Sequence, residues 1–174
     1  MAVREILLLG NPRLYEVSEP VRREELAELR AVFDDLRDTL HDFRRRHHCG
    51  RAIAAPQIGV MKRLIYWQVD EPRILLNPAL GQLSSETFEL WDDCLCFPEL
   101  LVKVKRHRSC TVHFMDADWV ETTWDLGDDS SELIQHECDH LDGILATQRA
   151  IDSRSFAFRT QLSLTNVRNL QVNE

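Results

Sequence analysis

The chain has 174 residues, of which 44% are hydrophobic and 29% charged, and its formal net charge is −8. Such a length and composition suit one globular domain with a sizeable core. The acidic excess argues against nucleic-acid binding by the chain itself, because phosphate contacts need clustered Lys and Arg. Five cysteines are an odd number, which does not suit a disulfide framework. The sequence shows neither a signal peptide nor a run near the ~20 apolar residues of a membrane helix, so we expect a cytoplasmic protein with free thiols and no membrane partner.

Residues 24–47 carry apolar side chains at helical spacing, and charged residues fill the other face. This pattern predicts an amphipathic helix packed against the rest of the domain. The basic residues 44–48 suit the C-terminus of that helix and its dipole, and we interpret them as a solvated helix end. Gly50 is expected to end the helix.

Several short segments further along the chain have the composition or the period-2 alternation of strands. They are residues 64–69, 74–77, 102–105 and 110–115, with His113 expected to face solvent. A second helix is predicted from Asp129 or Ser130 to Leu141, because N-cap side chains precede it and Asp142-Gly143 follows it. Helix, strands and helix in this order predict an α+β domain.

The sequence His136-Glu137-Cys138-Asp139-His140 is an H-E-x-x-H motif on the second predicted helix. Residues at i and i+4 share one helix face, so both imidazoles can reach one metal ion while Glu137 lies beside it. This glutamate is placed to move a proton from water to a leaving amine. The motif alone does not choose among hydrolase families. No histidine follows His140, so the third ligand is sought upstream, where Cys94 is the best candidate.

Three blocks in this order resemble the peptide deformylase family. Residues 50–57 are similar to the family's G-x-G-[LI]-A-A-x-Q, residues 92–96 to E-G-C-L-S, and residues 135–140 to Q-H-E-x-D-H. The likeness extends from residue 1 to about residue 151. It implies an α+β fold in which antiparallel or mixed sheets pack around a central metal-binding helix, with the amphipathic helix N-terminal to them. We expect residues 1–174 to form a single catalytic domain of this kind, whose tail, 152–174, is unassigned.

The resemblance also implies the activity and its residues. The reaction is metal-dependent hydrolysis of an N-formyl amide, which releases formate and a free amine, with N-formylmethionyl peptides as the expected substrates. One divalent ion, usually Fe²⁺ but also Zn²⁺, Ni²⁺ or Co²⁺, would be held by Cys94, His136 and His140. The implied catalytic groups are Glu137, the Gln57 side chain and the backbone N–H of Leu95. The implied substrate-binding residues are Gly50, Arg51, Ala52, Asp93 and Leu133. Any transient place near the ribosome is not readable from the sequence.

This chain departs from the family pattern at several motif positions. Ala52 and Asp93 replace glycines, and Cys96 replaces a serine and is interpreted as a packing residue. Asp92 replaces a glutamate, so an ion pair with Arg106 would have to span a shorter side chain.

The stretch 127–134 is polar where relatives have an apolar run that lines the methionine pocket, and Arg51 stands where an apolar residue is common. One explanation is a shifted helix start with its charges facing water. Another is a related hydrolase for a different, more polar or smaller N-formyl substrate. A third alternative is a metal-binding homologue without hydrolase activity.

Overall fold

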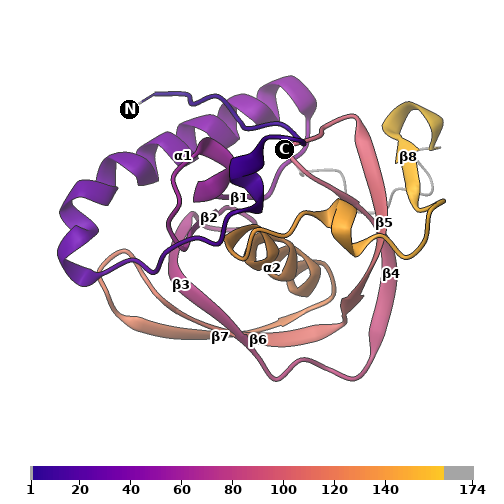
Figure 1. Ribbon diagram of the computed structural model, residues 1–174. Coiled ribbons are helices and arrows are strands. Elements are labelled where there is room, and N and C mark those ends of the chain that lie inside the picture. The colour runs from indigo at the N-terminus through magenta and orange to yellow at the C-terminus, as the bar shows by residue number, and fades with distance from the viewer. Residues whose placement is uncertain (1, 163–174) are drawn as a thin grey trace.

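The computed structural model describes residues 2–162, in which two β-sheets enclose a central helix (Figure 1). The helices are α1 (Leu26–His47) and α2 (Asp128–Leu141), with 3-10 helices at Pro12–Tyr15, Arg23–Glu25, Ala55–Ile58, Ala146–Arg149 and Arg159–Gln161. The strands are β1 (Ala52–Ala54), β2 (Leu64–Trp67), β3 (Arg73–Gly81), β4 (Thr87–Asp93), β5 (Leu100–His107), β6 (Ser109–Met115), β7 (Glu121–Gly127) and β8 (Phe156–Phe158).

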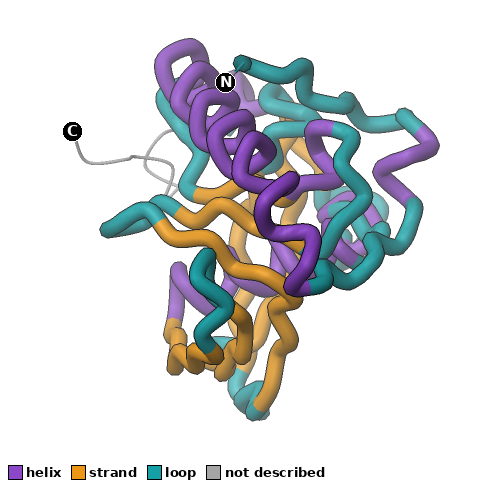
Figure 2. The backbone as a smooth tube through the Cα atoms, turned by 90° about the vertical axis from the view of Figure 1, so that its left-hand side faces the viewer, coloured by secondary structure: helices purple, strands orange, loops and turns teal. Residues whose placement is uncertain are grey.

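The strands form a five-stranded sheet in the order β1-β2-β3-β6-β7 and a three-stranded sheet in the order β4-β5-β8. Every pairing between these strands is antiparallel. Helix α2 contacts both sheets, and α1 packs against β1 and β2 on the face opposite α2 (Figure 2). The predicted α+β architecture with antiparallel sheets around the H-E-x-x-H helix is therefore confirmed.

Helix α1 ends at His47, as predicted, but the residue that caps it is His48 rather than Gly50. His48 adopts a left-handed conformation with φ 56° and its N–H bonds to the carbonyl of Arg44, so it takes the capping position expected of Gly50. Gly50 follows with φ 107°, and a Cβ there would lie 3.1 Å from Cδ1 of Leu40. The glycine thus lets the chain turn closely against α1 and enter β1.

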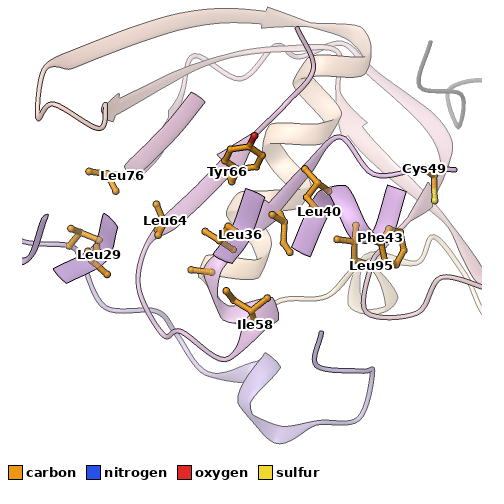
Figure 3. Close-up of a cluster of buried hydrophobic side chains, with 13 residues drawn as sticks. Leu29, Leu36, Leu40, Phe43, Cys49, Ile58, Leu64, Tyr66, Leu76 and Leu95 are labelled. Carbon is orange, nitrogen blue, oxygen red and sulfur yellow. The ribbon is translucent and has the colours of Figure 1, made fainter. Parts of the chain in front are cut away.

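Strands β1 and β2 are buried on both faces, between α1 and α2. Ile53, Leu64 and Tyr66 pack with the apolar face of α1 in one core cluster (Figure 3). Alternate residues, such as Ala52 and Ile65, pack with α2 in a second cluster. Because side chains alternate across a strand, continuous apolar runs are what such a doubly covered edge requires.

Strands β3, β5 and β6 extend beyond the predicted segments, whereas β2 ends at Trp67 and is shorter than predicted. β3 continues through Pro78 by a register shift between Leu76 and Ala79, with Asn77 at φ 52°, although Pro78 was expected to end it. Proline is tolerated at such a bulge because no ladder N–H is required there. β1, β4, β7 and β8 were not predicted, and β8 lies in the part of the tail that is described. Residues 163–174 of the predicted domain lie outside the described residues.

Helix α2 is buried along almost its whole length, from Ser131 to Leu141. It ends at Asp142, and Gly143 follows with φ 70° at a point where a Cβ would lie 2.6 Å from the carbonyl oxygen of Tyr15. The predicted stop is thereby confirmed, and it sets the end of α2 against the N-terminal segment. Among residues 2–162, no helix combines the length and apolar character that crossing a bilayer requires.

Candidate active site

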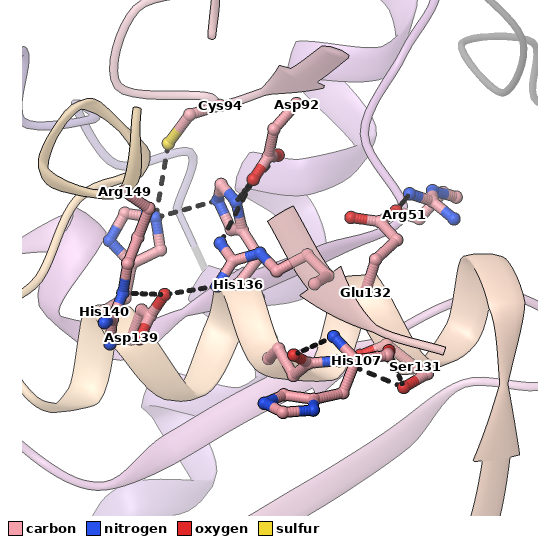
Figure 4. Close-up of polar contacts among 12 residues, drawn as sticks. Arg51, Asp92, Cys94, His107, Ser131, Glu132, His136, Asp139, His140 and Arg149 are labelled. Carbon is pink, nitrogen blue, oxygen red and sulfur yellow. Dashed lines mark hydrogen bonds and ion pairs between the residues drawn. The ribbon is translucent and has the colours of Figure 1, made fainter. Parts of the chain in front are cut away.

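Two histidines on α2 and a cysteine from another element meet at one point. Nε2 of His140 lies 3.2 Å from Nε2 of His136 and 3.2 Å from Sγ of Cys94, which follows β4 (Figure 4). The three donor atoms all lie within 4.8 Å of one another, and all three residues are buried. The structure therefore brings together the three residues that the sequence nominated as metal ligands.

The chemistry of these donors fits a divalent ion. A thiolate and two imidazole nitrogens at this spacing match the three-ligand sets that leave a fourth position open for water. Burial, with a further contribution from neighbouring Cys96, raises the pKa of the Cys94 thiol, so a cation is needed there to favour the thiolate. Among residues 2–162, Nδ1 of His140 and Oε2 of Glu137 are buried without a hydrogen-bond partner.

Asp92, near the end of β4, orients the first histidine. Its carboxylate oxygens lie 2.9 and 3.0 Å from Nδ1 of His136, which leaves Nε2 of that ring directed at the other two ligands. Burial opposes protonation of His136, but the contact with Asp92 outweighs it and raises the pKa of this imidazole to about 10. A metal ion at Nε2 must therefore displace a proton.

A buried chain of ion pairs supports this arrangement. Arg106 on β5 donates to Asp92 at 3.1 Å and to Asp139 on α2 at 2.5 Å. Asp139 in turn accepts from Arg149 at 2.7 Å. The Asp92–Arg106 pair is thus formed despite the shorter side chain, and Asp139 is an ion-pair partner outside the Cys94–His136–His140 cluster. The network ties the three-stranded sheet and the 3-10 helix Ala146–Arg149 to α2.

Glu137 follows the first histidine and is fully enclosed. Burial raises the pKa of its carboxyl group to about 7, although the positive field of His136 acts in the opposite direction. A carboxyl group with a pKa near neutrality can both accept and return a proton at physiological pH. The unpartnered Oε2 leaves it free to do so.

Gln57, from the 3-10 helix after β1, is held with its amide nitrogen toward the sulfur atoms. Its Oε1 accepts from the backbone N–H of Ala54 at 2.8 Å, and its Nε2 lies 3.7 Å from Sγ of Cys94 and 3.5 Å from Sγ of Cys96. Cys96 packs in the core beneath the three-stranded sheet, as expected of a packing residue. Leu95 is buried against the cluster that contains α1.

The predicted substrate-binding residues fall into two groups. The side chains of Ala52 and Leu133 pack in the core cluster between α2 and the five-stranded sheet, and Ala52 has the extended backbone of β1 rather than a positive φ. Gly50, Arg51 and Asp93 are partly exposed. Their contacts with substrate stay predictions.

Two ion pairs beside the site were not predicted. Arg51 pairs with Glu132 of α2 and also donates to the carbonyl of Asp129 at 3.2 Å. Glu132 is 2% exposed, so the explanation that the charges of this helix start face water is wrong for this residue. Its position four residues before His136, on the same helix face, was the available signal. The second pair joins Asp93 to Arg159, at 3.0 Å.

A helix that carries two imidazoles and a buried carboxylate, with a thiol from a neighbouring sheet, defines a metallohydrolase-type site. Comparison with known proteins identifies the kind. The sequence model of the polypeptide deformylase family matches residues 3–156. Peptide deformylase 1 of Prochlorococcus marinus is 35% identical over 96% of this chain and 91% of that protein.

Solved structures give the same result. A peptide deformylase from Thermotoga maritima superposes with a TM-score of 0.80 at 25% identity, over 87% of this chain and 100% of that one. One from Legionella pneumophila superposes with a TM-score of 0.78 at 30% identity, over 85% and 86%. The chain belongs to the polypeptide deformylase family. The family and the metal-dependent hydrolase activity expected from the three motif blocks are confirmed.

Proposed function

We propose that this chain removes the formyl group from N-formylmethionyl peptides and uses Cys94, His136, His140, Glu137, Gln57 and Leu95 to do so. The observation that carries the proposal is the meeting of one sulfur and two Nε2 atoms beside the buried, unpartnered carboxylate oxygen of Glu137. Membership of the polypeptide deformylase family supports the reaction type.

Each residue has a distinct task in this mechanism. Cys94, His136 and His140 would hold a divalent ion, which would supply Lewis-acid activation of the water that attacks the formyl carbon. Glu137 takes a proton from that water and delivers it to the departing amine nitrogen, which gives formate and a free amine. The Gln57 amide and the backbone N–H of Leu95 donate to the oxygen on which negative charge develops.

We propose Fe²⁺ as the native ion, with Zn²⁺, Ni²⁺ and Co²⁺ as substitutes. One thiolate and two imidazoles are ligands that all four ions accept, so the donor set alone does not choose among them. The described cysteines are all free thiols and all buried, which suits a reducing compartment, and we place the protein in the cytoplasm.

The decisive experiment is formate release from N-formyl-Met-Ala by iron-loaded protein under anaerobic conditions. We expect turnover that is lost when a chelator removes the ion, regained when it is restored, and inhibited by a hydroxamate. Cys94→Ser should lower the metal content of the purified protein. A metal-loaded wild-type protein that releases no formate from any N-formyl peptide would overturn the proposal and leave a metal-binding homologue without activity.

A second candidate substrate class is favoured by one observation. Arg51 and Glu132 place charge beside the ligand cluster, where an apolar side chain of the substrate gains no binding free energy. This supports a smaller or more polar N-formyl substrate, and a panel of N-formyl amino acids and peptides tests it directly.

A further inference from the structure

The Arg51–Glu132 ion pair lies one helical turn N-terminal to His136. Residues 132, 136 and 140 are spaced at i, i+4 and i+8, so Glu132 extends the stripe of α2 that carries both histidine ligands. Figure 4 shows Glu132 and Arg51 on the same side of α2 as Cys94. The Arg51 side chain is 23% exposed while that of Glu132 is 2% exposed, so the guanidinium group is the accessible end of the pair.

The pair is close enough to act on the reacting groups. Glu132 and Arg51 both shift the pKa of Glu137, in opposite directions. At the opposite end of the ligand cluster, Asp139 is already bound to Arg106 and Arg149. The partly exposed guanidinium group of Arg51 therefore marks the N-terminal end as the place where a substrate can put atoms that extend away from the reacting bond.

Geometry assigns the first side chain of the substrate to that space. Its Cβ is three bonds from the formyl carbon, and a side chain as long as methionine or glutamine adds three more. This reach is comparable to the ~5.4 Å pitch that separates Glu132 from His136. A substrate whose formyl carbon lies beside Glu137 can thus bring its first side chain against Arg51.

We propose that the Arg51–Glu132 pair determines which first residue the enzyme accepts, and that it favours N-formyl peptides whose first side chain is a neutral hydrogen-bonding group, such as an amide or a hydroxyl. The inference rests on the proposed deformylase function. An amide oxygen can accept from Arg51, and the amide N–H can donate to Glu132. An apolar side chain covers the ion pair without replacing the hydrogen bonds of the water it displaces. A charged side chain meets one like charge in the pair, whichever its sign.

The test compares N-formyl-Gln-Ala with N-formyl-Met-Ala, whose first side chains have nearly equal length. The quantity measured is the ratio of kcat/KM for the glutamine peptide to that for the methionine peptide. The double variant Arg51→Leu with Glu132→Leu replaces the ion pair by two apolar side chains of similar size. We expect the ratio to fall by about tenfold or more relative to wild type, because the amide then has no partner.

A second double variant, Arg51→Gln with Glu132→Gln, separates polarity from folding. It keeps hydrogen-bonding groups at both positions and should retain a ratio close to that of the wild type. Metal content per chain and near-UV circular dichroism show whether each variant is folded and loaded. Active variants that all give the wild-type ratio would overturn this inference and leave the deformylase proposal standing. If no protein, the wild type included, releases formate from either peptide, the deformylase proposal fails and the inference with it.

Discussion

The two halves of α2 carry buried polar residues of different kinds. From Gln135 to His140 they agree with the family motif, and they lie at the ligand cluster and its supporting ion pairs. The segment Asp128–Leu133 departs from the family pattern, and its buried charged residue Glu132 is matched by Arg51 from another part of the chain. The C-terminal half, Gln135–His140, holds the groups proposed to break the formyl C–N bond. The N-terminal half adjoins them and includes none of the proposed metal ligands or Glu137, which separates the residues of the reaction from those proposed to choose the substrate.

The strongest test of the C-terminal half is Glu137→Gln, which keeps the shape of the side chain and removes its ability to transfer a proton. We expect kcat to fall by about 10²–10⁴-fold while metal content stays at the wild-type level. Formate release and metal analysis measure the two quantities. Glu89→Gln, an exposed change on β4, is the matched control and should leave both unchanged. Full activity in Glu137→Gln would remove this residue from the mechanism.

The N-terminal half of α2 is tested most strongly by Arg51→Leu alone, which removes the partner of Glu132. This change leaves the carboxylate of Glu132 buried without its partner, and we expect the free energy of unfolding to fall by about 3–5 kcal/mol. The double change with Glu132→Leu should cost much less, because no buried charge is left over. Denaturant unfolding of metal-loaded protein measures both. Arg45→Leu, which breaks an exposed pair with Asp42, is the control and should cost about 0–1 kcal/mol.

The result that would contradict this expectation is an Arg51→Leu protein as stable as the wild type. Glu132 would then be stabilised without the guanidinium group. Burial already raises the pKa of Glu132 to about 7 even with Arg51 present, so its charged form depends on that partner.

Support of the ligand cluster is tested by Asp92→Asn. Loss of this carboxylate weakens the hold on Nδ1 of His136 and breaks the ion pair with Arg106. We expect the affinity for the metal to fall by about 10–100-fold, measured by competition with a chelator. Asp125→Asn, at an exposed position of β7, serves as the control. Equal affinities in the two variants would show that the histidine needs no carboxylate to orient it.

The residues of the ligand cluster could be predicted because their spacing is local. His136 and His140 lie one turn apart on a helix, and the block around Cys94 has a short, recognisable pattern. The Arg51–Glu132 pair could not be predicted in the same way, since its members are 81 positions apart. Glu132 lies four residues before His136, and this spacing was sufficient to place it on the buried face of α2. Its partner could not be predicted, because the pairing depends on how β1 packs against α2.

The same distinction holds for the fold. The long amphipathic helix was readable from its period, and the apolar runs of β2 and β3 were readable from their composition. β7 also alternates, with Thr122, Trp124 and Leu126 on one face, and this period-2 pattern was sufficient to predict the strand. β8 has only three residues and forms because it pairs with β5, far away in the sequence. A strand that depends on such a partner carries little local signal.

The smallest effect is expected where the C-terminal segment meets the site. Arg159 donates to Asp93, the residue before Cys94, and also to the carbonyl of Pro98, but both charged side chains are about one quarter exposed. Exposed pairs of this kind contribute about 0.2–1 kcal/mol, so Arg159→Ala should lower the free energy of unfolding by that much and leave metal affinity unchanged. Arg154→Ala, in the exposed turn before β8, is the matched control. A tenfold loss of metal affinity in Arg159→Ala would mean that this contact holds the Cys94 turn in place. Asp93, one of the residues that depart from the family motif, would then contribute to the metal site.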